Sequence, residues 1–281
     1  KIKKDQYVLH FQNKMIGLFL GDTDFSEAVL NRIKKLKKKY FIIDFSKNSK
    51  FKKNKYSHQI SIGKFGKIID LIKDKKSKKV LFAGKITKPK FSSLRLDLKG
   101  IYYMPSVIKA SKQGDAAIIK TIINILDKEN IKVVKSNYFN PELSQKKGIY
   151  TKLKPNKNNL KSIKKGIKHF NRLNKLDHVQ ALIVKDNRII ASESNKGTKN
   201  MISKLKKGSD GILIKLPKKN QDLRMDLPTI GFGTLKDCKK YGLKGVVLKS
   251  RKNIFLDKSK SINFANKNKI FIKVIWKEFL Y

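Results

Sequence analysis

The hydrophobic pattern of the first half of the chain alternates between short apolar runs and amphipathic segments. The apolar runs are almost uninterrupted, which is typical of strands buried on both faces of a parallel sheet. Between them, apolar residues recur at three- and four-residue spacing, which predicts helices packed on that sheet. The predicted strands cover 15–20, 40–45, 79–83 and 131–134, and the predicted helices cover 25–33, 68–72 and 116–126.

The segment 140–159 interrupts this pattern, because it contains prolines, a glycine and a run of Lys and Asn. We interpret residues 141–157 as a linker between a first domain over 1–140 and a second domain over 158–281. The second domain begins with a predicted helix and then a hairpin whose turn is Lys185-Asp186-Asn187. Its predicted strands cover 179–184, 188–193, 211–216, 245–248, 253–256 and 270–275, and its predicted helices cover 160–173, 198–205, 234–241 and 258–265. Short strands and helices in both halves predict an α/β fold.

The composition excludes several kinds of protein and site. The apolar runs are far shorter than the ~20 residues that a membrane-spanning helix needs, so no such helix is expected. No apolar stretch of signal-peptide length follows the basic start of the chain, so no secretory signal is expected. The single cysteine, Cys238, excludes an internal disulfide and is expected to be a small apolar residue. The histidines show no metal-ligand spacing, so a bound metal would be a hard cation such as Mg²⁺; they are His10, His58, His169 and His178.

The charge of the chain is strongly positive. It has 68 basic and 21 acidic residues and a formal net charge of +47. Such a field attracts polyanions, so nucleic acid and anionic membranes are candidate partners. Nucleic acid is the weaker candidate, because only six of the basic residues are arginine, the side chain that reads bases and phosphates with a planar fork. Lysines spread over the whole chain are typical of a solvated surface, with weak adhesion to anionic membranes as a by-product.

Two strand ends of the first domain are candidate phosphate sites. Gly21-Asp22-Thr23-Asp24 lies between the first strand and the first helix, where an open α/β sheet binds ligands and a helix offers free N–H groups. The alternative interpretation is an ordinary strand–helix turn with Asp24 as the helix cap. Ala83-Gly84-Lys85 ends the third strand, and a glycine with a lysine there suits a phosphate. An ordinary turn with a surface lysine is equally compatible.

Acidic residues are scarce, so their positions in the second domain are informative. The segment Gln221–Gly231 holds Asp222, Arg224 and Asp226 in a loop-like stretch. Carboxylates at this spacing suit Mg²⁺ or a water molecule, and the arginine suits a phosphate, although a surface salt-bridge cluster is the alternative. Glu193 precedes Gly197-Thr198 and is either a binding group or strand-end polarity beside a helix cap. No P-loop, Gly-x-Ser-x-Gly elbow or histidine triad is present, so serine or cysteine nucleophiles are not expected.

In this order and spacing, the segments resemble the UDP-2,3-diacylglucosamine pyrophosphatases of the LpxI type. The resemblance covers about 15–275, and its most specific part is Gln-Asp-x-Arg-x-Asp-x-Pro-x-Ile-Gly at 221–231. It also rests on Leu81–Lys85 and on the segments that begin at Gly114, Gly148, Gln180 and Gly242. The resemblance implies two α/β domains, the first with a Rossmann-like parallel sheet and the second with a mixed sheet and helices.

The resemblance also implies an activity. Enzymes of this type use Mg²⁺ and water to split the pyrophosphate of UDP-2,3-diacylglucosamine in lipid A biosynthesis. The products are UMP and 2,3-diacylglucosamine 1-phosphate, which is known as lipid X. A cytoplasmic homodimer at the inner face of the inner membrane is implied as well, and a basic surface suits that anionic environment.

Site residues follow from the same resemblance. Asp226 is expected to hold Mg²⁺ or orient the attacking water, with Asp222 as the second candidate for catalysis and metal binding. Arg224 and Lys215 are expected to contact the diphosphate. The other residues expected to bind substrate are Gly21, Thr23, Gly84, Lys85, Gln180, Glu193, Gly197, Thr198 and Gln221.

The sequence departs from the family pattern in two places. Thr23 and Ser26 stand in the first loop where the family usually has a glycine and a proline, and Lys196 and Lys199 stand where it has acidic residues. An inactive homologue that still binds the nucleotide-lipid is therefore one alternative. A nucleic-acid-binding protein, suggested by the charge, is another. Retention of both aspartates and the arginine of the 221–231 segment favours an active enzyme.

Overall fold

The computed structural model describes residues 14–173, 179–218 and 221–276, which form two compact units. Unit 1 comprises the described residues up to Asn140 together with Asp222–Asp226. Unit 2 comprises those of Pro141–Gln221 and those from Leu227 onward. Across these ranges no helix is both long enough and apolar enough to cross a bilayer.

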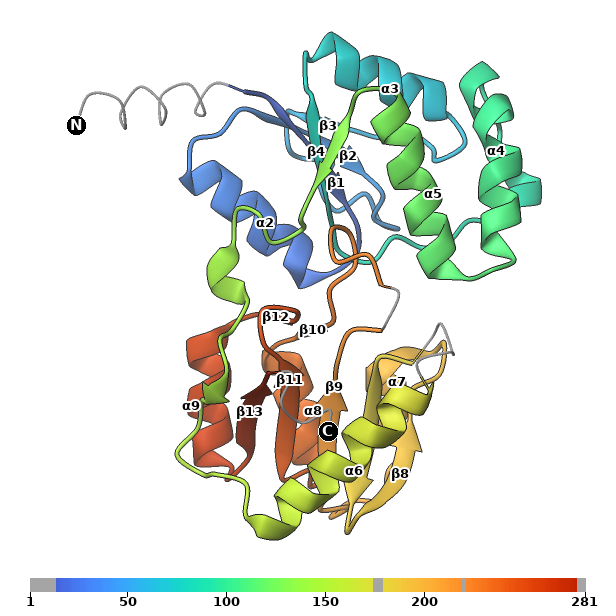
Figure 1. The fold of residues 1–281 in the computed structure, drawn as a ribbon. Coiled ribbons are helices and arrows are strands. Elements are labelled where there is room, and N and C mark those ends of the chain that lie inside the picture. The colour runs from blue at the N-terminus through green and yellow to red at the C-terminus, as the bar shows by residue number, and fades with distance from the viewer. Residues whose placement is uncertain (1–13, 174–178, 219–220, 277–281) are drawn as a thin grey trace. The chain divides into compact units, whose positions relative to one another are not determined.

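Unit 1 is built on a five-stranded sheet with the order β3-β2-β1-β4-β5, and every neighbouring pair is parallel (Figure 1). All five residues of the central strand β1 are buried, as its unbroken apolar run predicts. The strands are β1 (Ile16–Leu20), β2 (Tyr40–Asp44), β3 (Ser57–His58), β4 (Lys79–Ala83) and β5 (Lys132–Val134).

Helices cover both faces of this sheet: α2 (Asp24–Lys35) on one, α3 (Phe65–Asp74) and α5 (Asp115–Lys128) on the other (Figure 1). Isoleucines of α3 and α5 pack with Phe19, Ile43 and Phe82 of the strands into one buried cluster. The helix α4 (Leu98–Ser111) packs mainly on α5 and α3, so it forms an outer layer. A short 3₁₀ turn, η1 (Phe91–Ser93), precedes it.

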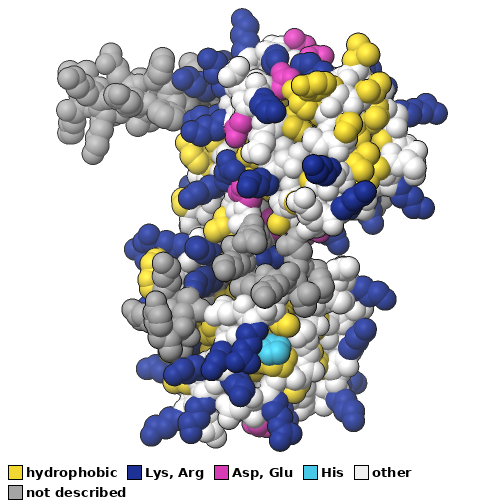
Figure 2. Space-filling view, turned by 45° about the vertical axis from the view of Figure 1, so that its right-hand side comes forward, with side chains coloured by type: hydrophobic (Ala, Val, Ile, Leu, Met, Phe, Trp, Pro, Cys, Tyr) yellow, Lys and Arg dark blue, Asp and Glu magenta, His cyan; other side chains and the backbone are white. Residues whose placement is uncertain are grey.

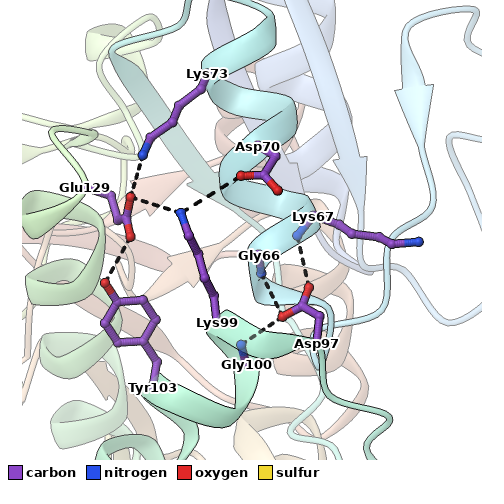
Figure 3. Close-up of polar contacts among 9 residues, drawn as sticks. All are labelled: Gly66, Lys67, Asp70, Lys73, Asp97, Lys99, Gly100, Tyr103 and Glu129. Atoms are coloured by element: carbon purple, nitrogen blue, oxygen red, sulfur yellow. Dashed lines mark hydrogen bonds and ion pairs between the residues drawn. The ribbon is translucent and has the colours of Figure 1, made fainter.

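Two acidic residues join the helices of unit 1 (Figure 3). Asp97 is the N-cap of α4, where its carboxylate accepts the Gly100 N–H at 2.8 Å. The same carboxylate accepts the N–H groups of Gly66 and Lys67, both at 3.0 Å, and so also stabilises the first turn of α3. Glu129, at the end of α5, accepts from Lys73 of α3 at 2.6 Å and from Tyr103 and Lys99 of α4 at 3.0 and 3.4 Å.

Unit 2 is built on a six-stranded mixed sheet with the order β6-β13-β11-β9-β7-β8. The three strands β13, β11 and β9 are parallel, and the other neighbouring pairs, β13·β6, β9·β7 and β7·β8, are antiparallel. The strands are β6 (Gly148–Ile149), β7 (Ala181–Lys185), β8 (Arg188–Ser192), β9 (Ile212–Lys215), β11 (Gly245–Lys249) and β13 (Phe271–Ile275). A separate parallel pair is formed by β10 (Thr229–Ile230) and β12 (Ile254–Phe255).

The helices of unit 2 cover both faces of its sheet. α6 (Lys157–Leu173) buries Ile163, Ile167 and Phe170 against one face. The opposite face packs against α7 (Gly197–Ser203), α8 (Phe232–Lys240) and α9 (Lys258–Lys267). Cys238 lies in this second cluster, fully buried, and burial raises the pKa of its thiol to about 12. Its position among buried apolar side chains confirms its predicted role as a small apolar residue.

The structure confirms an α/β fold in both units, with a parallel sheet in the first and a mixed sheet in the second. The predicted hairpin is present as β7 and β8, and its two turn residues, Asp186 and Asn187, have φ of 45° and 61°. Positive φ at both central positions is the type I′ geometry that suits a two-residue hairpin turn. Four elements have no counterpart among the predicted ones: β3, α4, β6 and β10.

The segment 141–157, which the sequence predicts as a linker, takes part in unit 2. It contains the 3₁₀ turn η2 (Pro141–Leu143) and the edge strand β6, which pairs with β13. The segment Asp222–Asp226, which the sequence assigns to the second domain, has its contacts in unit 1.

Replacing Asp97 by Ala is expected to destabilise unit 1 by about 0.5–2 kcal/mol, the usual range for loss of a helix cap. Burial acts to raise the pKa of Asp97, but three backbone N–H donors and nearby Lys64 outweigh it, so this pKa lies below its ordinary value. The stabilisation is therefore present above the unfolded pKa and is lost as the pH falls through the lower folded pKa. Urea unfolding of wild type and variant at neutral and acid pH measures both effects. Asp74→Ala, an exposed aspartate of α3, is the control, and an equal loss there would contradict the assignment.

Candidate active site

The carboxyl edge of the first sheet is where its topology predicts a ligand. From β1 the chain moves outward to β2 and β3, then returns to the other side of β1 for β4 and β5. The strand order therefore reverses between β1 and β4, and open α/β sheets bind ligands at such a switch point. Gly21 directly follows β1, and Gly84 directly follows β4. The two candidate phosphate loops are thus neighbours, as parallel pairing of their strands requires.

The two loops are tied together by backbone hydrogen bonds. The Gly21 N–H donates to the Ala83 carbonyl at 2.9 Å, and the Asp22 N–H donates to the Lys85 carbonyl at 3.0 Å. The buried Ser26 hydroxyl lies 2.8 Å from the carbonyl oxygens of both Gly21 and Ala83, which share its proton. The sequence singles out Ser26 only as a departure from the family pattern. Its structural role could have been inferred because this polar residue lies on the apolar face of α2, beside buried Phe25, Val29 and Ile33.

Both glycines are needed for this close approach. A Cβ at Gly21 would collide with the carbonyl of Lys85. A Cβ at Gly84 would occupy the position of the Ser26 hydroxyl, and Gly84 has a φ of +85°, which side-chain-bearing residues rarely adopt. These glycines therefore have a packing role, in addition to any contact with a ligand.

The start of α2 differs from one of the two interpretations of its sequence. The N-cap is Thr23, which makes no side-chain cap hydrogen bond, and Asp24 is the first helical residue. The interpretation of Asp24 as the cap is therefore wrong. The neighbouring Asp22 instead accepts the Lys47 N–H at 2.8 Å, which fixes the loop after β2. No side chain caps this helix end, so the hydroxyl of Thr23, which lies against Gly84, is not occupied in capping.

The loop Asp222–Asp226 is anchored on unit 1 at the carboxyl end of β5. The Ser136 N–H, two residues beyond β5, donates to the Arg224 carbonyl at 2.8 Å. Met225 packs against the buried cluster that contains Phe19 and Phe82. All strands of this sheet are parallel, so the end of β5 lies at the same edge as the ends of β1 and β4 (Figure 1).

Within this loop the first aspartate is paired with the arginine. The Asp222 carboxylate accepts from the Arg224 side chain at 3.0 Å (Nε to Oδ1) and 2.8 Å (Nη2 to Oδ2). It also accepts the Arg224 backbone N–H at 2.9 Å. Hydrogen bonding to Arg224 lowers the pKa of Asp222 despite its partial burial. The Asp226 N–H donates to the Asp222 carbonyl at 3.1 Å, so the loop places both carboxylates within one turn.

Four predicted residues of unit 2 form a connected polar cluster at the ends of β7, β8 and β9. Lys215 Nζ donates to Thr198 Oγ1 at 2.9 Å, and Thr198 donates to Glu193 Oε1 at 2.6 Å. The other oxygen of this buried glutamate accepts the Gln180 N–H at 2.8 Å. Asn253, which the sequence did not single out, donates to the Lys215 carbonyl at 3.0 Å. Glu193 thus connects Gln180 and Thr198 by hydrogen bonds. Thr198 is not the N-cap of α7, so the interpretation of Thr198 as a helix cap is wrong.

The remaining predicted residues of unit 2 flank this cluster. Gly197 begins α7 with a φ of +84°. Lys196 and Lys199, the two lysines at family-acidic positions, are exposed. Gln221 accepts the Lys218 N–H through Oε1 at 2.9 Å. Residues 219 and 220, which precede the segment 221–231, lie outside the described residues.

No group of three or more His, Cys, Asp and Glu that could hold a metal ion occurs among the residues that the structure describes. Of the histidines, His58 lies on β3, where burial and nearby Lys75 lower its pKa. His169 lies on α6, and His10 and His178 fall outside the described ranges.

A cavity of about 410 Å³ in unit 2 involves other residues. The cavity lies at the edge of the sheet formed by β6 and β13. The polar cluster lies toward the opposite edge, at strands β9, β7 and β8. Its lining includes Lys147, Lys154 and Lys273 but none of the candidate residues.

Comparison with known proteins gives two matches to family models. The LpxI N-terminal domain matches residues 15–143, and the LpxI C-terminal domain matches residues 146–273. A curated relative from Caulobacter vibrioides, named UDP-2,3-diacylglucosamine pyrophosphatase LpxI, is 28% identical over 223 residues. This alignment spans 76% of the present chain and 80% of the relative.

Replacing Gly84 by Ala is expected to destabilise unit 1 by about 2 kcal/mol or more, because the methyl group displaces the Ser26 hydroxyl and the residue keeps a positive φ. Gly233→Ala is the matched control. Nothing lies within 4 Å of its Cβ position, and it sits inside α8, so alanine should stabilise there by up to about 1 kcal/mol. Urea unfolding of both variants measures the difference, and equal effects would refute the packing role of Gly84.

Proposed function

This chain belongs to the LpxI family, and we propose that it hydrolyses UDP-2,3-diacylglucosamine at its pyrophosphate in lipid A biosynthesis. The products are UMP and 2,3-diacylglucosamine 1-phosphate. The observation that carries the proposal is the joint match of both family domains, one after the other, over nearly the whole chain. The retained Asp222, Arg224 and Asp226 in one anchored loop support it.

The reaction needs a nucleophilic water and compensation of charge on the diphosphate. Water adds to one phosphorus while the bridging oxygen leaves with its electron pair, and negative charge grows on that oxygen. We assign Asp226 to hold Mg²⁺ and to orient the water. Arg224 carries a positive charge next to it in the loop and suits a phosphate through its planar fork.

The donor set fits Mg²⁺ better than a metal that needs a complete protein cage. Mg²⁺ usually takes one or two carboxylates and completes its shell with water and substrate phosphates. The absence of a three-carboxylate or histidine group in the described part of the chain is compatible with that mode of binding. When bound, the ion neutralises diphosphate charge and polarises the phosphorus centre.

The pairing of Asp222 changes its proposed role. Both of its oxygens accept from the Arg224 side chain, so ligation of a metal would compete with a two-pronged ion pair. We therefore propose that Asp222 mainly orients Arg224, and that Asp226 is the principal metal ligand.

The polar cluster of unit 2 supports a second phosphate-binding group. Glu193 fixes the Thr198 hydroxyl, and this hydroxyl accepts from the Lys215 ammonium. An ammonium held in this way loses less side-chain entropy when it binds an anion. We propose that Lys215 contacts the diphosphate and that Gln180, Glu193 and Thr198 position it.

We also propose that the enzyme works at the anionic cytoplasmic face of the inner membrane and forms a homodimer. The net charge of +47 and the lipid-linked substrate support the first statement. The second rests on the family resemblance, and light scattering of the purified protein tests it.

Asp226→Asn is expected to lower UMP release by a factor of about a hundred or more, because it removes a charge needed mainly in the transition state. Release should require Mg²⁺ and stop when a chelator is added. The matched control is Asp186→Asn, the same change at an exposed hairpin turn, which should keep wild-type turnover. Wild-type turnover of the Asp226 variant, with both proteins folded, would show that this site assignment is wrong.

The inactive-homologue alternative makes a separate prediction about the two exposed lysines. The side chains of Lys196 and Lys199 are exposed. The hydrogen bonds that position Lys215 come from Thr198 and Glu193 and involve neither of these lysines. The double variant Lys196→Glu and Lys199→Asp should therefore change turnover by less than about threefold. An inactive wild type that becomes active in this variant would identify the chain as an inactivated homologue.

A further inference from the structure

Helix α4 carries a row of large apolar side chains on the side that faces solvent. Leu98, Ile101, Tyr102 and Ile108 are 86%, 59%, 76% and 38% exposed. Pro105 is exposed as well, so the row follows one helix face at three- and four-residue spacing. Figure 2 brings this side of unit 1 forward and shows hydrophobic side chains gathered there, with Lys and Arg around them.

The opposite face of α4 already holds the helix in place. Gly100, Met104 and Ala110 are buried, and the Tyr103 hydroxyl donates to Glu129. Asp97 caps the first turn of α4 and ties it to α3 (Figure 3). The exposed row therefore contributes little to packing within unit 1. Contiguous exposed apolar surface of this kind marks an interaction site.

The border of the row is basic. Arg95, Lys67, Lys109 and Lys112 are exposed around it. Of the nearby acidic groups, Asp97 and Glu129 are engaged in the hydrogen bonds described above. Two others are exposed, namely Asp70, which lies 3.9 Å from Lys99, and Asp115 at the start of α5. Positive charge thus outweighs negative charge beside the apolar row.

We propose that α4 is the element that docks this protein on an anionic lipid bilayer. Leu98, Ile101 and Tyr102 enter the boundary between headgroups and acyl chains, and the basic border contacts the anionic headgroups. Tyrosine suits this boundary, because its ring is apolar and its hydroxyl is polar. A second copy of the chain fits this face less well, since pairing would bring two basic borders together.

This inference goes beyond the proposed hydrolysis. Its binding test uses no substrate, so failure of membrane docking and failure of the proposed hydrolysis can be distinguished. The probes are phosphatidylcholine vesicles with and without phosphatidylglycerol. Wild type should sediment with the anionic vesicles and much less with the neutral ones. The triple variant Leu98→Ser, Ile101→Ser and Tyr102→Ser should lower partitioning into anionic vesicles about tenfold or more.

A matched triple variant separates this surface from exposed apolar residues in general. Leu36, Tyr56 and Ile190 are 36%, 44% and 40% exposed and lie on other elements. Their replacement by Ser removes the same three side-chain types and should leave partitioning unchanged. Circular dichroism and thermal unfolding check that both triple variants are folded. Equal loss of binding in the two variants, or no loss in the α4 variant, would overturn the proposal.

A fluorescent probe locates the docking face without weakening it. In a Trp276→Phe background, which removes the single native tryptophan, Ile101→Trp should shift its emission to shorter wavelength when anionic vesicles are added. Tyr56→Trp in the same background should not shift. A shift at position 56 and none at position 101 would place the docking face elsewhere.

Two other outcomes would assign the row to a different occupant and refute the proposal. If the α4 triple variant changes the mass of the protein measured by light scattering, the row contacts a second copy. If it raises KM for substrate dispersed in detergent micelles while vesicle binding stays intact, the row contacts the acyl chains of the substrate. The proposal expects both quantities to remain at their wild-type values.

Discussion

Five residues that follow β9 of unit 2 in the sequence, Asp222–Asp226, are held in unit 1 by a backbone hydrogen bond and an apolar contact. The Ser136 N–H donates to the Arg224 carbonyl, and Met225 packs against the buried cluster of unit 1. Within the segment, the Asp222 carboxylate accepts from the Arg224 side chain. Asp226 is placed by this anchored turn, so the position of the proposed metal ligand depends on the packing of unit 1. A change in the cluster under Met225 would therefore reach the site without touching any group that binds substrate.

The carboxyl edge of unit 1 combines two constraints at the same residues. Gly21 and Gly84 are the points at which two loops approach too closely for a Cβ, with the Ser26 hydroxyl between them. The same approach brings backbone and the Thr23 hydroxyl to the switch point of the sheet, where ligands of open α/β folds bind. Packing and binding thus favour the same small residues there, and glycine at these positions does not distinguish the two roles.

In a chain with such an excess of lysine, several of the scarce acidic residues connect separate elements of the fold. Asp97 and Glu129 join three helices of unit 1, and Asp44 accepts the N–H groups of Ser46 and Phe51 in the loop after β2. Glu193 organises the polar cluster of unit 2, and Asp222 organises the loop in unit 1. The lysines, in contrast, have a proposed role mainly where they border an apolar surface, as around α4, because there they can contact anionic headgroups.

Elements whose pattern is local could be predicted from the amino-acid sequence. Unbroken apolar runs predict β1, β2 and β4, and the polar residues 185–187 predict the β7·β8 hairpin, because burial on both faces and turn geometry depend on adjacent residues. The α4 helix was missed, because its apolar row faces solvent and Gly100 and Pro105 interrupt the helical signal. The family pattern indicated the candidate site residues, but contacts formed on folding determine which of them lie together. The Glu193–Thr198–Lys215 chain and the transfer of Asp222–Asp226 to unit 1 depend on contacts between distant segments, and no local pattern encodes those.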